Sequence, residues 1–94
     1  MAIMKYTEQE LAEVLVQLPN WVLKNEKLYR KLSFDNFVGA FGFMASVALV
    51  AEKMDHHPEW CNVYGTVEVY LTTHDAQGIS ERDLRLAQAI DAMA

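Results

Sequence analysis

One long apolar segment, from about Asn36 to Met54, limits most strongly how this chain can fold. We expect a helix capped by Ser33 or Asp35. Its apolar residues form two rows rather than one stripe: Phe37, Phe41, Met44, Ala48 and Ala51 in one row, and Phe43, Val47, Val50 and Met54 in the other. A helix that is apolar over so much of its surface is normally buried on more than one side. In a chain of 94 residues, the second side is expected to face a partner subunit or closely packed parts of the same chain.

Two further helices and four strands are predicted around this segment. Thr7 and Glu10 form a capping box before a first helix, and Ser80 and Asp83 form another before a C-terminal helix. Between the helices lie runs rich in β-branched and aromatic residues, which predict two hairpins. Their strands are expected at 21–23 and 27–34, and at 60–64 and 66–73, with a loop at 75–78.

The element order is therefore α-β-β-α-β-β-α. Its connections favour an α+β fold in two layers, with a four-stranded antiparallel sheet and three helices on one face. We expect residues 1–94 to form a single domain. The other face of the sheet then requires water or a partner.

Charge and apolar content exclude several function classes. The net charge of -5 argues against direct nucleic-acid binding, which needs a basic surface. The N-terminus shows no signal-peptide apolar region, and the uncharged run 37–51 is shorter than the roughly 20 residues of a membrane-spanning helix. We expect a soluble, cytoplasmic protein, with its single cysteine, Cys61, as a small buried residue.

All three histidines, His56, His57 and His74, lie between positions 52 and 83. Histidine titrates near neutral pH, so this grouping suggests a site that handles protons. Glu52 and His56 are four residues apart, and a helix reaching His56 would pair them. Pro58 disfavours the helical conformation at His57, so the helix should stop there.

Other interpretations of these residues remain open. A histidine at a helix C-terminus is often a favourable charge at the end of the helix dipole. Trp60, Tyr64 and Tyr70 are more often packed on a sheet than arranged around a ligand. A zinc shell from three histidines and Glu52 is a further alternative, although neighbouring histidines lack the four-residue helical spacing of paired ligands.

The spacing of these residues closely resembles the pterin-4a-carbinolamine dehydratases, also known as dimerisation cofactors of a homeodomain transcription factor. The likeness extends from about Trp21 to the C-terminus. The family pattern is present here in full as Glu52, His56-His57-Pro58, Tyr64, His74 and Asp83.

The resemblance implies the same fold, assembly into a homodimer or homotetramer, and an enzyme without a cofactor or metal. The expected reaction is loss of water from 4a-hydroxytetrahydrobiopterin or a related pterin to give quinonoid dihydropterin. His56 and His74 would be the acid–base pair, His57 would hold the pterin, and Glu52 would orient His56. Further candidates for binding the pterin are Asp55, Trp60, Thr72 and Thr73. The alternative is a protein-binding module that acts as a dimerisation cofactor, coactivator or assembly factor.

Overall fold

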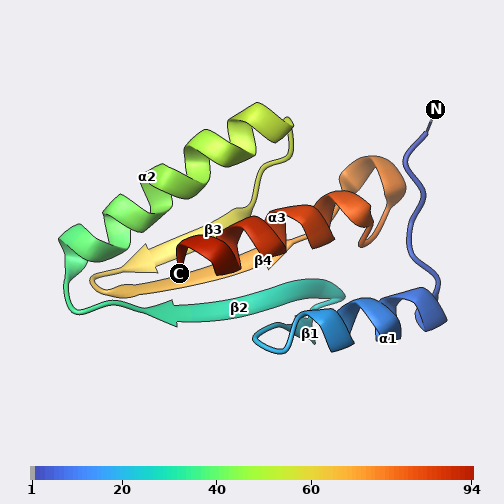
Figure 1. The fold of residues 1–94 in the computed structure, drawn as a ribbon, viewed down its shortest axis with the longest axis horizontal. Coiled ribbons are helices and arrows are strands. Elements are labelled where there is room, and N and C mark those ends of the chain that lie inside the picture. The colour runs from blue at the N-terminus through green and yellow to red at the C-terminus, as the bar shows by residue number, and fades with distance from the viewer. Residues whose placement is uncertain (1) are drawn as a thin grey trace.

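The computed structural model describes residues 2–94 and confirms the predicted element order, with three helices on a four-stranded antiparallel sheet (Figure 1). A short 3-10 turn, η1, occupies part of the expected 75–78 loop. The elements in chain order are α1 (Glu8–Gln17), β1 (Val22–Lys24), β2 (Lys27–Ser33), α2 (Phe37–Met54), β3 (Glu59–Val63), β4 (Thr66–Leu71), η1 (His74–Ala76) and α3 (Glu81–Met93).

The strand order in the sheet is β1-β2-β4-β3, so the two predicted hairpins meet along β2 and β4. Asn25 and Glu26 connect β1 to β2, and both have a positive φ, 54° and 63°. Two consecutive positive φ angles are typical of the tight turns whose twist matches a hairpin. Leu28 pairs with Leu71 across the centre of the sheet.

The core lies between the sheet and the helices. Successive strand residues point to opposite faces, and the inward positions of β4 are fully buried while their neighbours are partly exposed. Inward residues of β2 and β4 pack with residues of all three helices; the buried set includes Val14, Leu18, Leu28, Leu32, Val47, Ala51, Val67, Val69, Leu71, Leu86 and Ile90.

An ion pair joins the sheet to α3. Arg30 lies on the inward side of β2, and its guanidinium Nη1 is 2.5 Å from Oδ1 of Asp91. The same Asp91 oxygen accepts a hydrogen bond from the indole nitrogen of Trp21 at 2.8 Å. One carboxylate therefore satisfies two polar groups at the edge of the core, as partly buried polar atoms require.

The outward face of the sheet carries no helix among residues 2–94. Tyr29 and Tyr70 lie together there, with ring centroids 4.8 Å apart. The hydroxyl of Tyr29 donates to Glu68, and this hydrogen bond is the main cause that raises the pKa of Tyr29 to about 12. Cys61 is exposed on this face, so the prediction that it is buried is wrong. The reason is register, since its partner Glu68 points outward.

The helix ends follow local sequence signals with one exception. Both predicted capping boxes are formed, by Thr7 and Glu10 and by Ser80 and Asp83. Helix α2 is instead capped by Asn36, whose side chain accepts from the Gly39 amide, and not by Ser33 or Asp35.

Helix α2 is less buried than its composition suggests. Its inward row, Ala40, Phe43, Val47 and Ala51, is in the core. Four large apolar side chains of the same helix are exposed: Phe37, Val38, Phe41 and Leu49. The helix is long and apolar enough to cross a membrane by length and composition, which is weak evidence for a span because core helices of soluble proteins pass the same test. In this fold α2 packs on the sheet and beside α3.

Candidate functional site

The candidate site lies at one end of the sheet, where α2 ends, β3 begins, β4 ends and α3 begins (Figure 1). The register that pairs Leu28 with Leu71 and Glu59 with Tyr70 places the ends of three strands, β2, β3 and β4, at this end of the sheet. Short segments that are far apart in the sequence therefore meet there. All three histidines are among them.

His56 is the buried histidine of the site. Its Nε2 lies 2.6 Å from Oδ1 of Asp83, and the two side chains are 9% and 0% exposed. The other oxygen of Asp83 accepts hydrogen bonds from the Thr73 hydroxyl at 2.8 Å and the Ser80 amide at 2.9 Å. An ionised carboxylate can only accept, so Nε2 of His56 is the donor in this pair.

Buried hydroxyls complete this network. The oxygens of Thr73 and Ser80 are 2.6 Å apart. Because Thr73 donates to Asp83, the Ser80 hydroxyl donates to Thr73. Among residues 2–94, no buried side-chain nitrogen or oxygen is left without a hydrogen-bond partner.

The predicted pair of Glu52 and His56 is wrong. Helix α2 ends at Met54, and Asp55 adopts a left-handed conformation with φ of 53°. This reversal breaks the helical spacing and turns His56 inward toward Asp83. The carboxylate of Glu52 instead lies 2.8 Å from Nε2 of His57, and both side chains are exposed.

His74 begins η1 and is held from the opposite side. Its side chain is 80% exposed, and its Nε2 is 3.0 Å from Oε2 of Glu59. The other oxygen of Glu59 is 2.5 Å from Nζ of Lys27. The hydrogen bond from Lys27 is the largest cause that lowers the pKa of the Glu59 carboxyl, and His74 lowers it further. Glu59 is therefore ionised at neutral pH and can accept from both partners.

A cavity of about 210 Å³ lies between these segments. Its lining contains six predicted site residues together with two that were not predicted: Asp55, His56, His57, Thr72, Thr73 and His74, and Asp75 and Arg82. Glu52 is not in the lining and reaches the site through His57. Trp60 is not in the lining either, and packs against the core.

Two histidine partners, Asp83 and Glu59, and the lysine bonded to Glu59, Lys27, were absent from the predicted site. Asp83 was identified as a helix-capping residue and as the last position of the family pattern, but not as the partner of His56. The contact between Glu59 and Lys27 was not predicted, because these residues lie on different strands and meet only through the sheet register.

The arrangement gives each imidazole a carboxylate of its own. His56, His57 and His74 all use Nε2 for Asp83, Glu52 and Glu59, respectively. An imidazole bonded through Nε2 keeps a second ring nitrogen, Nδ1, which can accept or donate a proton. No three His, Cys, Asp or Glu side chains of residues 2–94 are grouped so that they could hold a metal ion.

Comparison with known proteins gives the family of this chain. Residues 4–93 match the family described as pterin 4 alpha carbinolamine dehydratase. The chain belongs to this family of hydro-lyases.

Relatives in the pterin-4-alpha-carbinolamine dehydratase family cover nearly the whole chain. A protein of Prochlorococcus marinus (strain MIT 9313) that carries the family's name is 55% identical over 87 residues, which are 93% of this chain and 91% of the relative. A Nitrobacter winogradskyi protein of the same name is 54% identical over 92 residues, covering 96% and 91%.

The fold is also shared with a solved member. The crystal structure of a transcriptional coactivator/pterin dehydratase from Brucella melitensis superposes with a TM-score of 0.92 at 44% sequence identity. The match covers 96% of this chain and 98% of that chain. The α+β architecture is therefore that of the family.

Removing the carboxylate of Asp83 should destabilise the whole domain. We predict that Asp83→Ala lowers the free energy of unfolding by about 3 kcal/mol, because it leaves three buried groups without their acceptor. The measurement is urea unfolding followed by circular dichroism. Asp75→Ala is the matched control, since Asp75 is 84% exposed and its loss should change stability by less than about 0.5 kcal/mol. Equal stability of the two variants would contradict the proposed importance of the buried network.

Proposed function

We propose that this protein is a 4a-hydroxytetrahydrobiopterin dehydratase, acting on that pterin or a close relative during tetrahydrobiopterin recycling in the cytoplasm. The reaction removes the hydroxyl from C4a and the proton from the neighbouring N5, and gives quinonoid dihydropterin and water. The observation that carries the proposal is the group of three imidazoles at one cavity, each bonded through Nε2 to a different carboxylate.

The elimination needs two proton transfers close together. One group must protonate the departing 4a-hydroxyl, and another must take the proton from N5. Such transfers work best from groups that titrate near the working pH, and imidazole is the side chain that does so without a special environment. No redox step is involved, because the carbon–oxygen bond breaks as the C4a–N5 double bond forms.

We assign the acid–base roles to His56 and His74, which line the cavity from different segments, the chain after α2 and the start of η1. Asp83 fixes the ring of His56, and burial limits its access to water. Glu59 holds His74 from the other side. Which of the two acts as the acid depends on the face from which the hydroxyl departs.

We assign binding of the pterin to His57, together with Asp55 and Thr72 in the lining. Glu52 acts here by orienting His57 rather than His56. Thr73 supports the site indirectly, since its hydroxyl is committed to Asp83.

Single histidine variants test these roles. We predict that His56→Ala or His74→Ala lowers kcat by about 100-fold or more, the usual range for general acid–base groups, while His57→Ala mainly raises KM. Stopped-flow measurement of the dehydration of chemically prepared 4a-hydroxytetrahydropterin provides both constants.

Circular dichroism checks that each variant is folded. A His56→Ala/His74→Ala protein that kept full activity would disprove the assignment. Wild-type activity should also persist in a chelator, and loss of activity there would favour the zinc alternative.

We further propose that α2 mediates assembly into a homodimer or homotetramer. Four large apolar side chains of α2 are exposed in the single chain: Phe37, Val38, Phe41 and Leu49. Contiguous exposed apolar surface of this kind usually marks an interaction site. The same surface is the observation that favours the second candidate function, binding of another protein.

A charge placed on this surface should break the assembly. We predict that the wild-type protein is oligomeric and that Val38→Asp shifts it toward the monomer, measured by size-exclusion chromatography with light scattering. Val16→Asp on α1 is the matched control, because Val16 is 82% exposed and Val38 is 78% exposed. A monomeric wild-type protein, or equal behaviour of the two variants, would contradict self-assembly through α2.

A further inference from the structure

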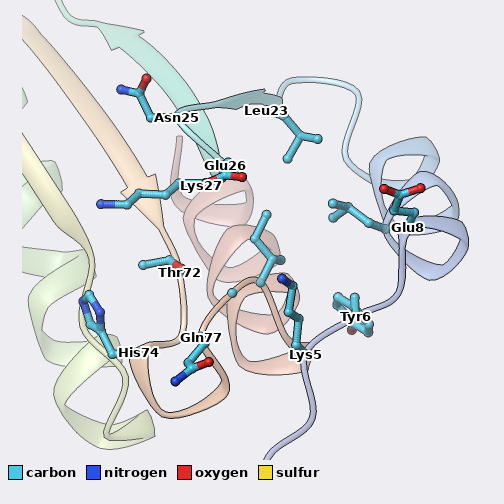
Figure 2. Close-up of a pocket in the computed structure, with 13 residues that line it drawn as sticks. Lys5, Tyr6, Glu8, Leu23, Asn25, Glu26, Lys27, Thr72, His74 and Gln77 are labelled. Atoms are coloured by element: carbon cyan, nitrogen blue, oxygen red, sulfur yellow. The ribbon is translucent and has the colours of Figure 1, made fainter.

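A second and larger cavity lies next to the histidine site. It has a volume of about 570 Å³ and is formed by the N-terminal segment before α1, the β1–β2 hairpin and the chain after β4. Thr72 and His74 line both cavities. Figure 2 shows these two residues at one end of the larger cavity and Leu23 and Glu8 at the other. A ligand held by the histidines can therefore extend past His74 into this outer cavity.

One backbone hydrogen bond and one side-chain contact hold the walls of the outer cavity in place. The Tyr6 amide donates to the Ile79 carbonyl at 2.8 Å, which attaches the N-terminal segment to the chain after η1. The Lys5 side chain packs over Gly78, where an added Cβ would lie 2.8 Å from its Cδ and Cε atoms. The cavity is thus present without a ligand, as small-molecule sites usually are.

The chemistry of the lining indicates the kind of group it would bind. Leu11, Leu23 and Ile79 supply apolar surface, and the side chains of Asn25 and Gln77 can both donate and accept hydrogen bonds. The charged residues of the lining are Lys5, Glu8, Glu26 and Lys27.

The charge balance of the lining disfavours an anion. The lining contains two lysines and two glutamates, so their formal charges cancel, and Lys27 is already paired with Glu59. Counting Glu59, which lies outside the lining, three carboxylates accompany the two ammonium groups. Hydroxyl groups, which donate and accept, suit this mixture better than a carboxylate or a phosphate does.

We propose that the outer cavity binds a neutral, hydroxyl-rich substituent of about sugar size, carried on C6 of the pterin. This inference rests on the proposed dehydratase function. C6 is bonded to N5, the atom from which a proton is removed, and His74 both serves the reaction there and lines the outer cavity. A cavity of about 570 Å³ is in the range that holds an entire drug-sized molecule, so a three-carbon side chain would leave most of it unfilled.

Binding of stable 7,8-dihydropterins tests the proposal without catalysis. The ligands are 6-methyl-7,8-dihydropterin, a glucosyl ether of 7,8-dihydrobiopterin, and 7,8-dihydrofolate with its anionic tail. We predict that the glucosyl ligand binds the wild-type protein at least about tenfold more tightly than the 6-methyl ligand does, a difference worth about 1.4 kcal/mol. Dihydrofolate should not bind more tightly than the 6-methyl ligand does. Isothermal titration calorimetry measures all three affinities.

Two tryptophan variants, at neighbouring residues on β1, test whether the tighter binding of the glucosyl ligand arises in the outer cavity. Leu23 lines the outer cavity and Val22 does not, and both are exposed. Leu23→Trp should abolish the preference for the glucosyl ligand and leave binding of the 6-methyl ligand unchanged, which also shows that the variant is folded. Val22→Trp should keep the preference.

The outcomes separate this inference from the proposed function. Equal affinity of wild-type protein for the glucosyl and 6-methyl ligands, or tightest binding of dihydrofolate, would overturn the inference and leave the dehydratase proposal intact. An unchanged preference in Leu23→Trp would also overturn it. If the wild-type protein bound no dihydropterin, the proposed function itself would fail.

Discussion

The buried carboxylate of Asp83 is the interaction on which the site depends most. It caps α3 by accepting from the Ser80 amide, accepts from the Thr73 hydroxyl in the chain after β4, and bonds to His56 just after α2. A buried carboxylate is costly unless its lone pairs are satisfied, and here three separate segments satisfy them. The same contacts that stabilise the fold therefore fix the orientation of one imidazole. We infer that Asp83 both stabilises the domain and orients the imidazole of His56 in the proposed site.

The three histidines differ in how firmly the protein holds them. His56 is buried against Asp83, whereas His57 and His74 are exposed and bonded to exposed or half-exposed carboxylates. Exposed pairs of this kind contribute little to stability. We infer that the side chains of His57 and His74 can change position when a ligand binds, while the side chain of His56 stays fixed. The family's reaction, a loss of water without redox chemistry, is compatible with such a mixture.

Much of the fold could be predicted because its signals are local. The capping boxes at Thr7 and Ser80 and the two hairpins were predicted from short stretches of sequence and are confirmed. The partner of His56 could not be predicted in this way. Asp55 leaves the helical conformation by adopting a positive φ. Glu52 and His56 therefore do not lie on the same face of a helix, although they are four residues apart. Glu59 and Lys27 meet near His74 only through strand register, a long-range property.

In the proposed site, all three imidazoles face one pterin. The chain contains three histidines, so long-range proton–nitrogen NMR spectra of uniformly labelled protein contain three ring patterns. Titration with the stable analogue 7,8-dihydrobiopterin is predicted to shift all three patterns with one common dissociation constant. Shifts of a single ring, or different dissociation constants for the three rings, would contradict a shared site.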